Sequence, residues 1–357
     1  MRSAALKPGA RERAGLQPAA RLGRGAILLG VPIAGLVVLC ALSLSVGARA
    51  IPLDQVVQAL SGGEVSKAVH DVIWSVRVPR TLLGLMAGAA LGLSGALMQA
   101  LTRNPLADPG ILGVSAGAAF AVVVAIAAFG IGSLYGYVWF AFAGALVVSV
   151  AVYVLGGLGR DGLTPVKLAL AGVAVTVMLS SLTSAIVLAD PESLNRYRFW
   201  SAGSLAGQGA QLMPQLAPFV AVGIVLALAS APALNSLALG DDVAVALGRR
   251  VGLVRLQGAA AVTLLTGAAV AAIGPVVFVG LVIPHLARLV ARWAGGETDH
   301  RLLLPLSTAL GPCLLLAADV AGRMIVPPIE VQAGIIVAFI GGPIFVILAR
   351  RARLAEL

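Results

Sequence analysis

The side chains that could do chemistry are few, and their spacing builds no catalytic site. The chain has three histidines, His70, His285 and His300, and two cysteines in separate apolar stretches, Cys40 and Cys313. No H-E-x-x-H or C-x-x-C pattern occurs to bind a metal, and no G-x-x-x-x-G-K-[ST] loop occurs to hold a phosphate. We therefore predict a chain that is not an enzyme, has no ATPase site of its own and binds no metal or other cofactor.

One acidic residue, Asp319, falls inside an apolar stretch, and Arg323 follows it by one helical turn. Residues four apart lie on one face of a helix, so an intrahelical ion pair is the simplest interpretation. An enzyme that works inside a membrane normally places several ionisable groups within its spans. His285 follows Pro284 at the boundary of an apolar stretch, where a structural histidine is favoured over one in a transport path.

A group of polar residues interrupts a hydrophobic run in TRNPLADPGILGVSAGA (102–118). The residue before a proline is pushed out of the helical conformation, and proline lacks an N–H donor, so Asn104-Pro105 ends a helix. Asp108 is a suitable N-cap, and Pro109 suits the first turn of the next helix. The pattern predicts a short turn between two helices.

The composition indicates which elements position these residues. Hydrophobic residues make up 59% of the chain and charged residues 11%, whereas a soluble domain is roughly 45–50% apolar and about 25% charged. The 43 glycines suit closely packed transmembrane helices. The net charge of +10 could indicate nucleic-acid binding, but the basic residues are scattered singly instead of forming one basic face. The sequence therefore predicts an all-α polytopic membrane protein.

Ten apolar stretches are long enough to cross a bilayer. They are 26–47, 79–100, 110–130, 135–156, 166–189, 214–238, 255–274, 276–293, 302–320 and 332–349. If the first span runs outward, 18 of the 25 Lys and Arg residues lie on the inner side. The positive-inside rule then places both termini in the cytoplasm.

The N-terminal segment resembles a signal peptide, because basic residues precede an apolar run and Ala48-Arg49-Ala50 follows it. A signal-peptide core has only about 7–15 apolar residues, and this run is longer, so we predict a retained first helix. The predicted organisation is a cytoplasmic tail (1–25), one transmembrane domain (26–350) and a second cytoplasmic tail (351–357).

Two segments between the spans are longer than turns. The outer segment, 49–78, is polar enough to lie in water or at the membrane interface. The inner segment, 235–255, contains short helical pieces separated by Gly240, Gly248 and Gly252. Charged residues in the inner segment suit the macrodipole of a short helix. Asp241 or Asp242 could lie in its first turn, and Arg249 and Arg250 in its last.

An internal repeat is also indicated. The pattern G-A-A-x-x-x-x-G begins at Gly88 and again at Gly267, and the same offset of 179 residues pairs Pro105 with Pro284. The first copy begins in a span that runs inward and the second in one that runs outward. This arrangement predicts an inverted repeat, as in many transporters, although Gly and Ala are common enough here for a chance match.

A transporter without an ATPase site needs an ion gradient or a partner. Gradient-driven carriers normally hold acidic or polar coupling sites near the middle of the bilayer, and this chain has almost none. The inner segment 235–255 favours a partner, because a short helix outside the bilayer is a rigid surface that a soluble ATPase could bind. A solvated loop with one helical turn is the simpler alternative.

Several stretches resemble signature regions of the FecCD family of ABC-importer permeases, which serve iron-siderophore, heme and vitamin B12 uptake. They are VRVPRTLLGLMAGAALGLSGALMQALTRNPLADPGILGVSAGAAFAVV, RFWSAGSL, LALGDDVAVALGRRVG, GPVVFVGLVIPHLARL and GGPIFVILARR. The resemblance covers residues from about 25 to the end. It implies a type II ABC importer permease with ten transmembrane helices in the bacterial cytoplasmic (inner) membrane. The implied partners are a second permease subunit of the same or a related chain, two ATPase subunits that bind ATP and Mg, and an extracytoplasmic substrate-binding protein.

The resemblance also implies roles for single residues. Arg77, Arg80 and Arg323 resemble arginines that receive acidic residues of the binding protein, and exposed cations at a docking rim would steer such a partner. Anchoring at the membrane interface is the alternative. The segment from Leu239 to Gly252 resembles coupling helices that insert into the ATPase, with these expected contact residues: Leu239, Gly240, Asp241, Asp242, Ala244, Val245, Ala246, Leu247 and Gly248.

Two gates are implied at the inner side. Asn104, Pro105 and Leu106 resemble the family's inner gate, and a second gate is expected near Thr164, Pro165 and Val166. Relatives can carry small hydroxyl residues at the second gate, whereas this chain has Pro165 and Val166 there. The role of the second gate is therefore open.

The resemblance also implies a substrate. TRNPLADPGILGVSAGAAF and RYRFWSAGSLAG look most like the ferric-siderophore branch of the family, and heme and cobalamin are the alternative substrates. Arg196 and Arg198 lie on the predicted outer face, where they could attract an anionic ferric chelate or anchor the interface. From other classes of protein, a gradient-driven secondary transporter and a membrane receptor or assembly subunit without transport stay open.

Overall fold

The computed structural model describes residues 18–47, 49–158, 165–207, 212–293, 299–327 and 329–355. Within these ranges the chain is helical, and its only β-type pairing is an isolated bridge between Val326 and Ile329. The long helices are α1 (Pro18–Ser45), α4 (Val78–Thr102), α5 (Val114–Phe129), α6 (Leu134–Gly157), α7 (Pro165–Ala189), α9 (Leu212–Ala238), α11 (Val251–Ile273), α12 (Val279–Trp293), α13 (His300–Ile325) and α14 (Ala333–Ala355). Each contains most of one predicted span, in the same order.

Short helices occupy the connections between the long ones. They are α2 (Leu53–Ser61), α3 (Lys67–Val72), the π-helical turn η2 (Ile73–Arg77), the 3₁₀ turn η3 (Pro109–Leu112), α8 (Pro191–Ser201) and α10 (Asp241–Ala246). The predicted outer segment 49–78 thus folds as α2, α3 and η2, and η2 continues directly into α4.

The helices confirm a multi-pass membrane fold but not its predicted number of crossings. In the described ranges, six helical stretches are long and apolar enough to cross a membrane: Lys67–Thr102, Tyr135–Gly157, Val166–Ala189, Leu212–Ala238, Val251–Ile273 and His300–Ile325. Three apolar helices are shorter: Gly30–Ser45, Val114–Phe129 and Ala333–Leu348. Ten crossings therefore stay a prediction.

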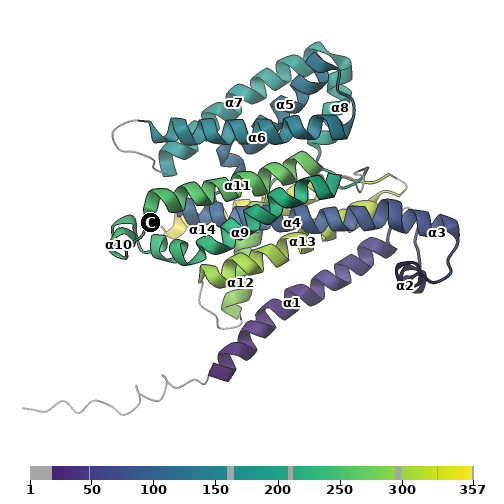
Figure 1. The fold of residues 1–357 in the computed structure, drawn as a ribbon, viewed down its shortest axis with the longest axis horizontal. Coiled ribbons are helices and arrows are strands. Elements are labelled where there is room, and N and C mark those ends of the chain that lie inside the picture. Colours follow the sequence, from purple (N-terminus) through teal and green to yellow (C-terminus); the bar gives the residue numbers. More distant parts are fainter. Residues whose placement is uncertain are drawn as a thin grey trace, which may run out of the picture.

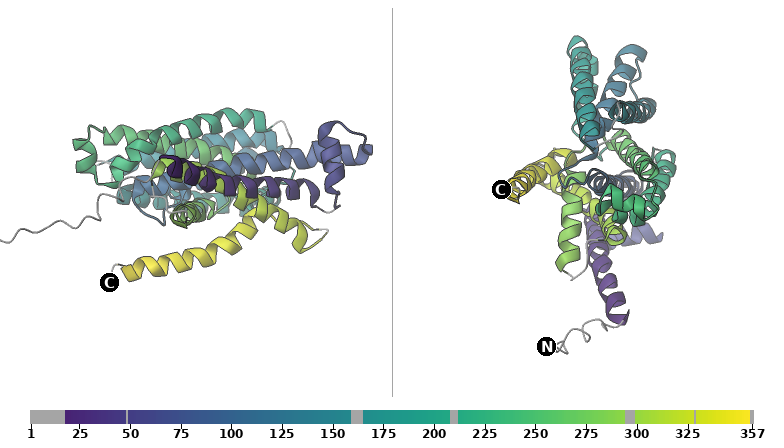
Figure 2. Two further views of the ribbon diagram at one scale, coloured as in Figure 1. Left: turned by 90° about the horizontal axis from the view of Figure 1, so that it is seen from below. Right: turned by 90° about the vertical axis from the view of Figure 1, so that its left-hand side faces the viewer.

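The long helices form two groups that lie side by side (Figure 1). In the first, α4 is central and packs against α9, α11, α12 and α13, while α1 lies along α13. The second contains α5, α6, α7 and α8, and contacts the first mainly through α11. The C-terminal helix α14 lies at the edge of the bundle, against α12 and α13 (Figure 2).

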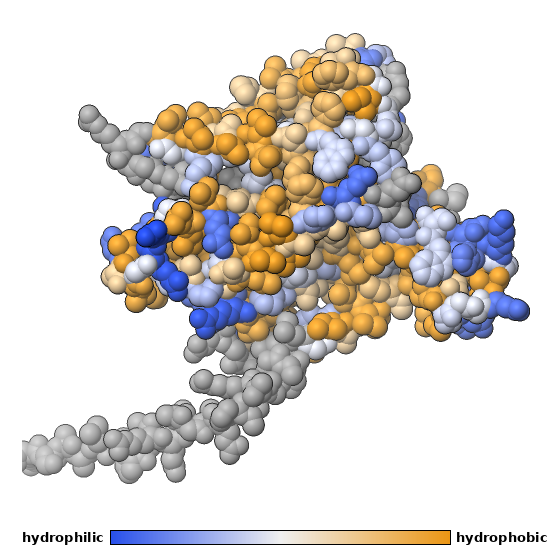
Figure 3. All heavy atoms as spheres, viewed as in Figure 1, coloured by the Kyte–Doolittle hydropathy of each residue, from blue (hydrophilic) through white to orange (hydrophobic). Residues whose placement is uncertain are grey.

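The two ends of the bundle differ from its middle. We call the end that carries α10 the inner end and the end that carries α2 and α3 the outer end. Hydrophilic residues gather at both ends of the long axis, and hydrophobic residues cover much of the surface between them (Figure 3). This distribution suits a bundle whose middle lies in lipid.

Glycines allow α4 to approach its neighbours closely, as the composition predicted. A Cβ atom added at Gly95 would lie 2.0 Å from the carbonyl oxygen of Gly280 in α12. A Cβ atom at Gly311 in α13 would lie 2.0 Å from the carbonyl oxygen of Gly88. Backbone therefore packs on backbone at two levels of α4, an arrangement that small residues permit.

Two of the three residue pairs of the predicted repeat do not occupy equivalent places, whereas Gly88 and Gly267 both lie inside long helices. Gly95 lies in the interior of α4, whereas its counterpart Gly274 ends α11 with a left-handed φ of 78°. Pro105 lies in a turn, whereas Pro284 lies inside α12 and not at a span boundary. The pattern could not distinguish a glycine that permits packing from one that ends a helix. The inverted repeat itself stays a prediction.

Candidate functional site

The predicted turn after α4 is confirmed. The helix ends at Thr102, and Arg103 is its C-cap with a left-handed φ of 50°. The side chain of Asn104 then accepts a hydrogen bond from the Leu106 N–H at 2.9 Å. Asp108 caps the next element by accepting a hydrogen bond from the Gly110 N–H at 2.9 Å. That element is the 3₁₀ turn η3, and α5 begins only after it.

A cavity of about 390 Å³ opens beside this turn, between the inner ends of α4 and α7. Its lining combines residues of the turn region with residues of α7: Thr102, Asn104, Ala107, Val166, Ala169, Leu170 and Val173. Asn104 and Val166, predicted for two separate gates, therefore face one cavity. Pro105 lines a neighbouring cavity of about 320 Å³ together with Arg103 and Arg288.

Part of the second predicted gate is beyond the structural description. Thr164 lies outside the described residues, and Pro165 is described only as the first residue of α7. Leu106 is half-buried in the turn and does not line the cavity of Asn104. The gating role of all six residues stays a prediction.

The inner segment folds as a short exposed helix, α10, bounded by Gly240 and Gly248 in left-handed conformations. Asp241 and Asp242 lie in its first turn, as predicted. The prediction for Arg249 and Arg250 is wrong, because α10 ends at Ala246 and both arginines follow it. Gly248 adopts a φ of 77°, which ends the helical path before they are reached.

The surface of α10 and its flanks is largely apolar. Leu239, Val243, Val245 and Leu247 are exposed hydrophobic residues at the inner end. Ala244 is fully buried, so its prediction as a contact residue is wrong: its side chain faces the bundle. Exposed apolar residues in one short segment are typical of a protein-binding surface.

The three outer arginines are not the exposed cations that the sequence suggested. Arg77 is 5%, Arg80 7% and Arg323 4% exposed. Exposure at a docking rim is therefore wrong for all three, because each guanidinium is turned inward onto carboxylates or backbone carbonyls. Their role in docking a binding protein stays a prediction, but steering by exposed charge no longer supports it.

Asp319 is the centre of a buried ion-pair network at the outer end. Arg80 donates to both of its carboxylate oxygens, with Nη2 2.8 Å from Oδ1. Arg323 donates to Asp319 from the same helix, which confirms the predicted intrahelical pair. Arg80 also pairs with Glu330 through Nη1 at 2.6 Å. Glu330 was missed because it lies in the connection VPPIEVQ (326–332), whose sequence shows no sign of pairing with a distant arginine.

Backbone contacts extend this network to α1. Arg323 Nη1 donates to the carbonyl oxygens of Ser43 and Val46, each at 2.8 Å. Arg77 donates to the carbonyl oxygens of Leu44 and Arg49. These carbonyls are free to accept hydrogen bonds because they lie at or beyond the end of α1, where no intrahelical donor reaches them. The contacts thus join α1, η2, α4, α13 and the connection before α14.

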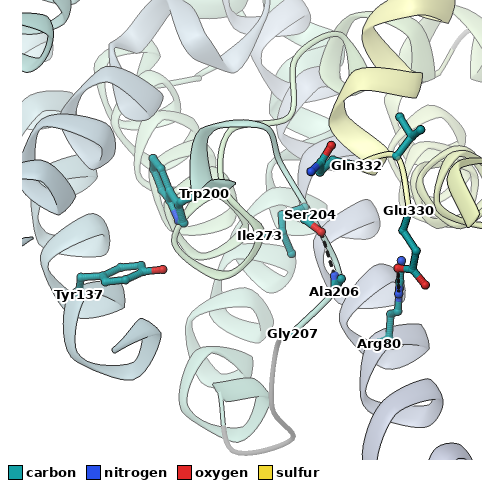
Figure 4. Close-up of a pocket in the computed structure, with 10 residues that line it drawn as sticks. Arg80, Tyr137, Trp200, Ser204, Ala206, Gly207, Ile273, Glu330 and Gln332 are labelled. Atoms are coloured by element: carbon teal, nitrogen blue, oxygen red, sulfur yellow. Dashed lines mark hydrogen bonds and ion pairs between the residues drawn. The ribbon is translucent and has the colours of Figure 1, made fainter. Parts of the chain in front are cut away.

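At the outer end, a further cavity of about 390 Å³ opens beside the ion-pair network (Figure 4). It is lined by Arg80, Tyr137, Trp200, Ser204, Ala206, Gly207, Ile273, Glu330, Val331 and Gln332. Its walls come from α4, α6, α8, α11 and the connection before α14, so both helix groups contribute. Arg80 reaches it with its charge already balanced by the network.

Trp200 is the most informative residue of this outer cavity. Its side chain is 6% exposed, and its indole N–H has no hydrogen-bond partner among the described residues. Tyr197 lies beside it, with the ring centroids 6.3 Å apart. A buried polar group without a partner is costly, and the residue that carries this one also lines the cavity.

Of the two arginines predicted for the substrate path, the structure describes the side chain of Arg198 only. Arg198 is exposed on α8 and is not among the lining residues. Arg196 lies in the same helix, but the placement of its side chain is not described. The substrate-path role of both arginines stays a prediction, and Trp200, which lines the cavity from α8, was not among the predicted residues.

Cavities lie at opposite ends of the bundle, and α4 contributes to each of them. In the described part of the chain, no group of three His, Cys, Asp or Glu side chains could hold a metal ion. His285 and His300 are held by Leu281 O and Asn235 Oδ1, at 2.9 and 2.7 Å.

Known proteins resemble this chain along most of its length. A model of the FecCD transport family matches residues 35–351. Ferric enterobactin transport system permease protein FepD of Escherichia coli (strain K12) is 46% identical over 333 residues, which cover 92% of this chain and 98% of that protein. Iron(3+)-hydroxamate import system permease protein FhuB of Bacillus subtilis (strain 168) is 42% identical over 335 residues, covering 92% and 84%.

A solved structure is also similar. It is a metal-chelate type ABC transporter in an inward-facing conformation, 29% identical, with a TM-score of 0.78 over 90% of this chain and 98% of that one. The sequence matches and this structural match agree on the whole membrane bundle. This chain belongs to the FecCD transport family.

Proposed function

We propose that this chain is the permease subunit of an ABC importer that moves ferric siderophores across the bacterial cytoplasmic membrane. Separate ATPase subunits, with their own ATP and Mg, supply the energy, and an extracytoplasmic binding protein delivers the chelate. A second permease of the same or a related sequence completes the path. Both termini lie in the cytoplasm.

One observation carries this proposal: α4 reaches a cavity at each end, and the inner cavity lies near an exposed apolar helix. A path with an opening at each end suits transport, and α10 offers a surface to the ATPase that the path requires. The relatives include siderophore, hydroxamate and citrate permeases, and they support an iron chelate as the substrate class. A hemin permease at 35% identity is more distant.

Uptake by the reconstituted complex tests the proposal. The permease, its ATPase subunits and its binding protein are purified and placed in liposomes. Uptake is measured with radioactive iron for a ferric siderophore and hemin, and with radioactive cobalt for cobalamin. We expect ATP-dependent uptake of the siderophore. Uptake driven by a proton gradient without ATP would instead support a secondary transporter, and preference for hemin or cobalamin would correct the substrate.

Docking of the binding protein onto the outer end is part of the proposal. The structure supports it through exposed segments rather than through buried arginines: α2 and α3 form that end and expose Asp54 and Asp71. Charge reversal at Arg77 and Arg80 would disrupt the buried network, so loss of stimulated ATP hydrolysis in that double variant would not by itself identify a docking contact.

Replacing Trp200 by phenylalanine tests whether the outer cavity contacts the cargo. We expect roughly threefold slower uptake, because a single neutral hydrogen bond contributes about 0.5–1.5 kcal/mol. Uptake is compared at equal amounts of folded complex, because Trp200 belongs to the hydrophobic core and the smaller ring also leaves space there. The matched control is Trp74→Phe, which removes an indole that donates to Ala59 O at 3.1 Å, in the outer segment. Equal uptake by wild type and Trp200→Phe would contradict a cargo contact.

A further inference from the structure

The carboxylate of Asp241 lies between two arginines from different helices. Its Oδ1 pairs with Arg103, the C-cap of α4, and its Oδ2 accepts a hydrogen bond from Arg255 Nη2 of α11 at 2.8 Å. Asp241 itself is the first residue of α10. One side chain therefore connects the exposed inner helix to two long helices of the bundle.

Arg103 stands directly before the turn beside the inner cavity. Its left-handed backbone is uncommon for a residue with a side chain, and it sets the direction in which the chain leaves α4. Asn104 follows at once and both lines the cavity and holds the turn through Leu106. A displacement of the Arg103 side chain therefore acts one residue away from Asn104, which lines the cavity between α4 and α7.

The exposure of the three side chains argues against a role in stability alone. The side chains of Asp241 and Arg103 are each 41% exposed, and that of Arg255 is 18% exposed. Ion pairs with this much contact with water contribute little to folding. The two ion pairs of Asp241 do, however, restrict where α10 can lie relative to α4 and α11. One carboxylate oxygen pairs with Arg103 of α4 and the other with Arg255 of α11.

The neighbouring acid provides a natural comparison. Asp242 lies in the same first turn, is exposed and forms no ion pair within the part of the chain that is described. Both acids were predicted as ATPase contacts. The geometry separates them: Asp242 is available to a partner, whereas Asp241 is already occupied within its own chain.

We propose that Asp241 is a positioning residue that transmits movement of α10 to the turn beside the inner cavity. Movement of α10 by a bound ATPase displaces the carboxylate, and the Arg103 pair carries that displacement to Asn104. The Arg255 pair holds the other oxygen to α11, so that α10 pivots there instead of moving freely. This inference rests on the proposed function, because it needs an ATPase that moves α10.

The test compares transport with ATP hydrolysis in the reconstituted complex. We expect Asp241→Asn to assemble and to hydrolyse ATP, while the amount of ferric chelate moved per ATP falls roughly fivefold, in the range that mutations of coupling networks produce. Arg103→Gln should show the same loss, and the double variant should be no worse than either single one. Arg292→Gln is the control, because Arg292 is exposed on α12 and takes no part in these pairs; it should keep the wild-type ratio. Asp241→Glu should retain most of that ratio.

A distance measurement separates transmission from mere support. Spin labels at Val245 and Leu106 should report an ATP-dependent distance change in the wild type that is lost in Asp241→Asn. A wild-type ratio in Asp241→Asn, additive losses in the double variant, or failure of Asp241→Asn to assemble would each overturn the inference. Absence of ATP-driven uptake by the wild-type complex would instead refute the proposed function, so the two failures are distinguishable.

Discussion

Replacement of Asp319 by alanine is expected to destabilise the protein by about 3–5 kcal/mol, the usual cost of removing one partner from a buried ion pair. Asp319 is 1% exposed and is the carboxylate shared by Arg80 and Arg323. Without it, Arg323 has only hydroxyl and carbonyl acceptors, and Arg80 keeps only Glu330. Two buried cations would then lie close together with one of their two negative partners removed.

The measurement is the midpoint of thermal unfolding of the purified permease in detergent, followed by the loss of the monodisperse peak in size-exclusion chromatography. Asp319→Asn keeps the shape and should also be strongly destabilised, because it removes the charge and one accepting oxygen. Asp71→Ala is the control: Asp71 lies on α3 with a side chain that is 58% exposed, so its effect should stay within about 0.5 kcal/mol. Unchanged unfolding of Asp319→Ala would contradict the network as a source of stability.

Substitution of Gly95 by alanine is expected to have the second large effect. The added Cβ would lie 2.0 Å from the Gly280 carbonyl oxygen and 2.2 Å from its Cα atom. Both are backbone atoms, so no side chain can move aside, and α4 and α12 must separate. Overpacking of this kind costs typically 1–3 kcal/mol, occasionally more, and the contact with rigid backbone favours the upper part of that range.

The same unfolding assay measures this effect, with Gly35→Ala as the control. Gly35 lies in α1, and a Cβ atom there would meet nothing within 4 Å. That control should be neutral or slightly stabilising, because alanine is the better helix former by about 1 kcal/mol. Equal unfolding midpoints for Gly95→Ala and Gly35→Ala would show that α4 and α12 do not pack as described.

Local features of the chain could be predicted because their causes are local. Asn104-Pro105 ends α4 and Asp108 caps η3, since each acts through the backbone of the next few residues. The acids of α10 lie in its first turn for the same reason. The Asp319–Arg323 pair follows from helical spacing alone. Apolar length was enough to locate the long helices.

Features that depend on distant partners could not be predicted. Arg80 is followed far along the chain by Asp319 and Glu330, and nothing in VRVPR shows that its charge would be neutralised. An unpaired arginine near a span end is most simply read as exposed, and that interpretation was wrong. Likewise, nothing in LALGDDVAVALGRRVG shows that Asp241 pairs with Arg103; its contact with an ATPase stays a prediction.

The sequence by itself determined that this is a helical membrane protein, where its helices and turns lie, and which transport family it resembles. These follow from apolar length, helix-ending residues and motifs, all of which act over short distances. Only the tertiary structure decided that the outer arginines are buried, that Asn104 and Val166 share a cavity, and that Trp200 presents an unpartnered donor. Those outcomes depend on which helices pack together, because burial and charge pairing arise between side chains that are distant in the chain.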